Sequence, residues 1–384
     1  MTRDFYDTIV MKNDDVDEFL TPLRVALKQC VREPLHMQLR VVEQAAVDIV
    51  VGPKQLESHI AVLREFMLME SGLVFDLFVE EAYSQTKSAS SSSSKTIRGL
   101  TPMRLNHIFE MSLQRAGHSS TGPFVKRFMY KRRMKSTSEK VPRAKSTSRA
   151  LLQSLDQLKA TYRVESTSML RLVITEDSVR TYAQIHSALL RTRCVQYSLR
   201  RLWVRLNYVL RQQRQEDKKA ALLNKSQRIL ARRMSSLQRS MRHVVDTLNG
   251  YLSTQVLHGF AWLELRRKLC DGSLKTVKDL KLAHETFLRA TARACFISED
   301  VMTSKIVRDA VDRCYDCIMQ FCETVDLHHG IQHDADYQGI SRSFRASTFE
   351  LCASLRTYAT CHGHLAHDQM RELRMALDPE FFAS

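Results

Sequence analysis

The chain of 384 residues contains only 11 glycines and 7 prolines, too few for the many tight turns of a β-sandwich or β-barrel. It has 58 Lys and Arg against 42 Asp and Glu, which gives a net charge of +16 and a pI of about 9.5. Such a charge favours an acidic partner, whether a nucleic acid, an anionic membrane or an acidic protein surface.

The first twenty residues do not combine a basic segment with an apolar one, so we expect no signal peptide. No run approaches the roughly 18 apolar residues of a membrane span, and we expect no membrane partner. Nine cysteines in such a chain are expected to be reduced thiols. These features predict a soluble protein of the cytoplasm.

The N-terminal part is predicted to be helical. Apolar residues at helical spacing indicate helices over 34–51 and 55–72, the second with Gly72 as its C-terminal stop. The pattern continues to residue 83. The serine-rich residues 84–98 are then predicted to be a flexible surface loop, and a short helix is expected over 104–117.

A basic tract follows. Residues 126–149 contain ten Lys and Arg and the single acid Glu139, and we interpret them as disordered or loosely attached. Phe128 and Tyr130 leave open a nucleic-acid contact here, although no known nucleic-acid-binding motif accompanies them. β-branched runs after the tract allow at most a minor short β element near 162–174.

A long helix is predicted from Thr175, a candidate N-cap, to about residue 213. Its apolar stripe includes Trp203, which we expect in the core with Trp262, and arginines lie between the stripe positions. The tract 211–242 is again basic, yet its apolar residues stay periodic, which indicates a helical surface. Four further helices are predicted over 241–269, 276–297, 302–325 and 340–363. The sequence therefore predicts an all-α protein with helical bundles of roughly ten helices.

Motifs for catalysis are not found. The chain has no Gly-rich phosphate loop, no G-x-S-x-G and no H-E-x-x-H. The best metal candidate joins Cys314, Cys317 and Cys322 to three downstream histidines (His328, His329 and His333), but the cysteines fall within a helical pattern and are interpreted as structural thiols. His284 is expected to be a partly buried, hydrogen-bonded histidine. We therefore predict no catalytic, cofactor or metal site, and no enzyme.

The order of several segments is familiar. The run YRVESTSMLRLVITEDSVRTYAQIHSALLRTRCVQYSLRRLW (162–203) resembles the start of the C-terminal domain of gamma-tubulin complex components, the GRIP-motif proteins. Segments 241–263, 280–297 and 372–382 are similar to later helices of that domain. Segment 59–83 resembles its junction with the N-terminal GRIP domain.

This resemblance implies a gamma-tubulin-binding scaffold subunit that supports microtubule nucleation. It implies three parts: a remnant of the N-terminal GRIP domain and junction over 1–83, a variable region over 84–149, and the gamma-tubulin-binding helical domain over 150–384. By this resemblance we expect a divergent member that lacks most of the N-terminal GRIP domain. The expected partners are gamma-tubulin and other gamma-tubulin complex components. The expected location is the cytoplasm and cytoskeleton, at a microtubule-organising centre such as a centrosome, spindle pole or basal body.

Arg163, Arg171, Arg342 and Arg345 are candidate interface residues, because basic side chains at the ends of elements can reach an acidic surface. Ordinary surface charge is the competing interpretation. The alternative function is a basic helical nucleic-acid-binding protein that acts through 126–149 and 211–242, but we do not expect a nucleic acid partner. A zinc enzyme that uses the Cys/His cluster is a third hypothesis.

Overall fold

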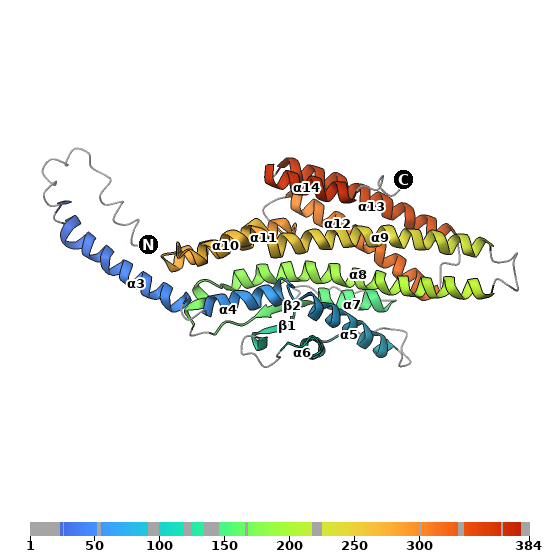
Figure 1. Ribbon diagram of the computed structural model, residues 1–384, viewed down its shortest axis with the longest axis horizontal. Helices are drawn as coiled ribbons and strands as arrows, with labels where there is room; N and C mark the ends of the chain where they lie inside the picture. The colour runs from blue at the N-terminus through green and yellow to red at the C-terminus, as the bar shows by residue number, and fades with distance from the viewer. Residues whose placement is uncertain are drawn as a thin grey trace.

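The protein is an elongated assembly of helices with one small sheet (Figure 1). The computed structural model describes residues 24–25, 27–51, 55–90, 100–118, 125–133, 146–165, 168–216, 225–298, 302–328, 334–361 and 364–377. The described helices are α3 (Glu33–Val51), α4 (Gln55–Val62), α5 (Gly72–Ser90), α6 (Pro102–Arg115), α7 (Thr147–Asp156), α8 (Glu176–Glu216), α9 (Lys225–His258), α10 (Phe260–Cys270), α11 (Val277–Ala294), α12 (Met302–His328), α13 (Asp334–Cys361) and α14 (His364–Leu377). The predicted all-α fold is confirmed.

The N-terminal helices differ from expectation at their ends. α4 passes into a π-helical turn, Leu63–Met67, and the chain then leaves the helix through Met69, which has a φ of 59°. Gly72 begins α5 and so does not stop the preceding helix as predicted. α5 also continues to Ser90, seven residues into the predicted loop 84–98, while 91–98 lie outside the described residues.

The small sheet corrects the predicted β element. β1 (Phe128–Arg132) pairs antiparallel with β2 (Leu158–Tyr162), with Phe128 opposite Tyr162. The basic tract 126–149 therefore starts as an ordered strand, and 134–145 lie outside the described residues. Of the β element predicted near 162–174, only Tyr162 belongs to β2, and Met169–Leu172 is a 3-10 turn. Each strand of this sheet forms only with a partner distant in sequence, and the local sequence does not identify that partner.

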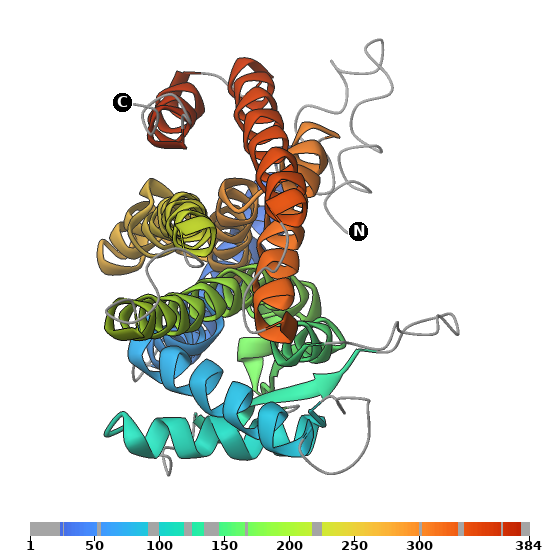
Figure 2. The ribbon, with the colours of Figure 1, turned by 90° about the vertical axis from the view of Figure 1, so that its right-hand side faces the viewer.

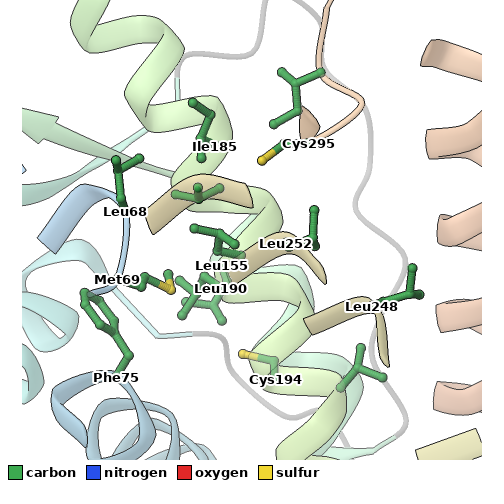
Figure 3. Packing of buried hydrophobic residues seen from close by; sticks show 14 of the residues in the cluster. Leu68, Met69, Phe75, Leu155, Ile185, Leu190, Cys194, Leu248, Leu252 and Cys295 are labelled. Carbon is green, nitrogen blue, oxygen red and sulfur yellow. The ribbon is translucent and has the colours of Figure 1, made fainter. Parts of the chain in front are cut away.

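α8 is the axis of the molecule. Thr175 Oγ1 accepts a hydrogen bond from Ser178 N at 3.2 Å, which confirms the predicted N-cap. From there α8 runs for 41 residues, with α9 packed antiparallel beside it. Figure 3 shows Ile185, Leu190 and Cys194 of α8 between the N-terminal segments and Leu248 of α9. One hydrophobic core extends from Val47 to Leu377.

The predicted helix over 241–269 is in fact two helices. α9 ends at His258 and α10 begins at Phe260, with Gly259 between them. A Cβ on Gly259 would lie 2.3 Å from the carbonyl oxygen of Gln255, so only glycine fits this bend. The change of direction leaves the apolar side chains of Phe260 and Leu263 exposed.

The C-terminal helices complete the bundle. α12 packs on α8 and α13, and α13 and α14 form the side opposite the sheet (Figure 2). α13 begins at Asp334, six residues before the predicted start of that helix. Within the described residues, none of the helices combines the length and the apolar content needed to cross a bilayer.

Candidate functional site

Two arginines near the middle of α8 form ion pairs with acids of neighbouring helices. Arg191 Nη1 lies 3.0 Å from Asp312 Oδ1 of α12, and Arg193 Nη1 donates to Asp76 Oδ1 of α5 at 2.9 Å. Burial raises the pKa of the Asp312 carboxyl, and the Arg191 charge opposes that rise. These arginines therefore fasten α8 to its neighbours and are not available to a partner.

Farther along, α8 and the first part of α9 are strongly basic. Residues 178–245, which form most of α8 and the first part of α9, contain sixteen Lys and Arg and only two acids. Among the described residues, no acidic side chain pairs with Arg200 or Arg211 of α8, or with Arg232 of α9. Most of the net charge of the chain is therefore concentrated on this helical pair.

The same part of α8 exposes large apolar side chains. Trp203 is 43% exposed, Val204 60% and Tyr208 62%. On a 3.6-residue helix they share one face with Arg200 and Arg211, and the opposite face is buried through Leu199, Leu202 and Leu206. We call the five residues Arg200, Trp203, Val204, Tyr208 and Arg211 the distal face.

The predicted place of Trp203 in the core is wrong. The sequence period fitted Trp203, but the buried stripe of α8 runs through Leu199, Leu202 and Leu206. Trp262 is half-buried against Phe287, with the Arg64 guanidinium 4.2 Å from its ring centroid, so it belongs to the edge of the core. An unusual exposed aromatic beside arginines was the signal that sequence reasoning missed.

The four predicted interface arginines fall into two separate pairs. Arg163 is exposed just after β2, and Arg171 lies 3.5 Å from Glu176 at the start of α8. Arg342 and Arg345 are exposed in the interior of α13, not near its start as predicted. β2 and α13 lie on opposite sides of the bundle (Figures 1 and 2), so the pairs do not make one patch.

Three buried histidines each contact a tyrosine hydroxyl. The distances are 2.7 Å for His59 and Tyr162, 3.0 Å for His186 and Tyr130, and 3.1 Å for His284 and Tyr182. The predicted buried and hydrogen-bonded state of His284 is confirmed, whereas His59 and His186 were missed. Burial lowers the pKa of each imidazole to about 4.

The tautomer of His186 follows from its neighbours. Its Nδ1 faces the carbonyl oxygens of Phe66 and Met67 at 3.1 and 3.2 Å, and a carbonyl only accepts, so Nδ1 carries the proton. Nε2 must then accept the hydroxyl proton of Tyr130. The neutral ring joins the segment before α5, β1 and α8, which is a structural role.

The cysteines of the candidate metal cluster lie along α12. Cys314 and Cys322 are buried and Cys317 is half-buried on α12, and within the described ranges no three His, Cys, Asp or Glu side chains converge. His329 and His333 lie outside the described residues. Burial raises the pKa of the Cys314 thiol to about 12, as for a thiol packed like a small hydrophobe.

The aromatic residues of the first basic tract are not available for base stacking. Phe128 and Tyr130 are both buried, and the Tyr130 ring stacks on Phe78 at 5.4 Å between centroids. Asn106 fixes the strand through both its amide atoms, since Oδ1 accepts from Tyr130 N and Nδ2 donates to Tyr130 O. The ordered part of 126–149 is therefore scaffold.

Comparisons with known proteins agree with this architecture. The family model "Gamma tubulin complex component C-terminal" matches residues 56–382. The chain is 26% identical over 295 residues to Gamma-tubulin complex component 6 of Mus musculus, and 26% identical over 285 residues to that of Homo sapiens. These matches cover 76% and 71% of the chain but only 15% and 13% of the relatives, so the chain spans a small part of their length.

Proposed function

The chain belongs to the gamma tubulin complex component family, and from this premise we propose that it is a gamma-tubulin complex subunit that binds gamma-tubulin and supports microtubule nucleation. The observation that carries the proposal is the continuous family match over 56–382. That region coincides with the single hydrophobic core of the described helices, so the matched segment is one folded unit.

The proposed role is that of a scaffold without catalysis. Family proteins are structural subunits of complexes. The titratable side chains with strongly shifted pKa values in the described part are buried His, Tyr and Cys within the core, which suits packing better than chemistry on a substrate. The remaining partners that we propose are other gamma-tubulin complex components.

The proposed location and domain division follow from the same family. We expect the protein in the cytoplasm and cytoskeleton at a microtubule-organising centre. Residues 1–83 would be the junction with the N-terminal GRIP domain, 84–149 a variable region, and 150–384 the gamma-tubulin-binding domain. Packing of α5 against α6 and α8, together with the pairing of β1 with β2, supports a close association of these three parts.

Binding of purified gamma-tubulin to the full chain tests this function. We expect a complex that survives about 150 mM salt, because a specific protein interface has an apolar centre as well as charged contacts. A chain with a helical circular dichroism spectrum that captures no gamma-tubulin would contradict the proposal.

The four arginines chosen from the sequence are tested in the same assay. Arg163, Arg171, Arg342 and Arg345 are exposed, so their reversal to Glu should leave the fold intact. Because the two pairs lie on opposite sides, separate double variants are compared. We expect at least one of them to weaken gamma-tubulin binding, and unchanged binding by both would remove these residues from the interface.

A further inference from the structure

The distal face has the composition of a protein-binding surface. Trp203, Val204 and Tyr208 form an apolar centre, and Arg200 and Arg211 lie at its two ends. Trp, Tyr and Arg are the residues that most often dominate binding energy at protein interfaces. On an isolated helix face, such side chains would otherwise expose apolar area to water without any benefit to the core.

The position of the distal face makes it accessible. α8 and α9 extend beyond α5 and α7 at one end of the molecule (Figure 1). Near the end of α5, the Arg201 guanidinium of α8 lies 4.4 Å from the ring centroid of Tyr83. At the same level α8 packs against α9, where Gln238 Nε2 donates to Leu199 O at 3.1 Å, and the buried Leu202 and Leu206 continue the apolar stripe of α8.

The basic residues of α8 and α9 indicate which kind of partner the distal face binds. The antiparallel α9 adds Arg232 at the same level as the distal face. Residues 178–245 contain sixteen basic residues and only two acidic ones. A phosphate-binding groove would place positive charge in its middle. Here the middle is apolar and the charge is peripheral, which is the arrangement of a protein interface with a polar rim.

We propose that the distal face docks an acidic polypeptide surface, whose apolar side chains cover Trp203 and Tyr208 and whose carboxylates pair with Arg200 and Arg211. This inference deepens the proposed function and rests on it in taking the partner to be a protein. The steering charge of the α8–α9 pair raises the association rate, and the apolar centre limits dissociation.

Two double variants of the full chain separate these contributions. R200E/R211E should weaken binding of gamma-tubulin about tenfold or more and reduce its salt dependence, because it reverses the rim charges. W203A/Y208A should weaken binding to a similar degree, about tenfold, but keep the salt dependence, because it removes only the apolar centre. All four side chains are exposed, so we do not expect the substitutions to unfold the protein.

The matched control is K278E/R289E on α11. It makes the same change of charge at two exposed residues outside the α8–α9 pair. Affinity within about twofold of the unchanged chain is expected for this control. If the control weakens binding as much as R200E/R211E, only net charge matters and the docking face is refuted.

Two further probes distinguish this inference from the proposed function. One is an acidic peptide of about 20 residues with alternating Glu and Leu positions, and the other is single-stranded DNA of similar charge. Gamma-tubulin binding that is unchanged in both double variants overturns the docking face and leaves the proposed function standing. If the unchanged chain does not bind gamma-tubulin, the proposed function fails, and peptide binding that requires the distal face still supports the inference. Preference for DNA over the peptide at this face overturns it.

Discussion

At the scale of single residues, the buried histidines link stability to pH. His186 and His284 are buried with pKa values of about 4, whereas an unfolded histidine titrates at about 6.5. Below that pH the unfolded chain binds protons that the folded chain does not, so the free energy of unfolding falls as pH falls. Both histidines contribute stability that is complete above pH 6.5 and is lost towards pH 4.

Urea unfolding at pH 7 and pH 5 measures this effect. We expect the free energy of unfolding to fall by about 1 kcal/mol or more for each of the two histidines between these values. Carboxylates titrate mainly below this window, so the histidines should dominate the change. Equal stability at both pH values would mean that the imidazoles are solvated or protonated in the folded state.

Sequence reasoning at this scale was right where the local pattern decides the outcome. His284 fell on an apolar helix face and is buried with a hydrogen bond. The prediction for Trp203 was wrong because a period of 3.6 residues leaves neighbouring stripes ambiguous. Only tertiary packing makes Leu202, and not Trp203, the buried residue. The distal face was therefore invisible from the sequence, although the arginines that flank it were evident.

At the scale of elements, Gly259 determines the break between α9 and α10. Gly259→Ala would bring a Cβ within 2.3 Å of the Gln255 carbonyl oxygen, and the backbone has to shift to relieve the contact. We expect a loss of about 1–3 kcal/mol in the free energy of unfolding. Denaturant unfolding followed by circular dichroism measures it.

Gly250→Ala is the matched control, because Gly250 lies within α9 with nothing within 4 Å of its added Cβ. There the substitution should increase stability by about 0.5–1 kcal/mol, as alanine is the better helix former. Equal effects at the two glycines would show that the bend at Gly259 carries no steric requirement.

Most elements were predictable because long amphipathic helices repeat their signal over many residues. α11 and α12 lie close to their predicted ranges. The exceptions depend on contacts distant in sequence. β1 requires β2, 26 residues later, and the helix before Met69 ends where His186 Nδ1 of α8 donates to the carbonyl oxygens of Phe66 and Met67. Local sequence cannot specify such partners.

At the scale of the whole molecule, the concentration of positive charge on α8 and α9 should affect stability. Like charges repel in the folded hairpin and separate in the unfolded chain. Salt screens this repulsion, with a Debye length of about 10 Å at 0.1 M. We therefore expect the Tm to rise between low salt and about 0.5 M NaCl.

Thermal unfolding in NaCl checks this expectation, with R200E/R211E as the comparison. That variant carries less repulsion, so its Tm should depend less on salt. A Tm that falls with salt would mean that the ion pairs of Arg191 and Arg193 outweigh the repulsion among the basic residues of α8 and α9.

The length of α8 has a mechanical consequence. At about 1.5 Å per residue its 41 residues form a rod of about 60 Å, anchored near its middle to α5 and α12. The orientation of a polypeptide bound at the distal face would therefore depend on how the anchored half of α8 is packed. A small change in the packing of α8 against α5 and α12 would be amplified over the length of the helix and would change the orientation of a polypeptide bound at the distal face.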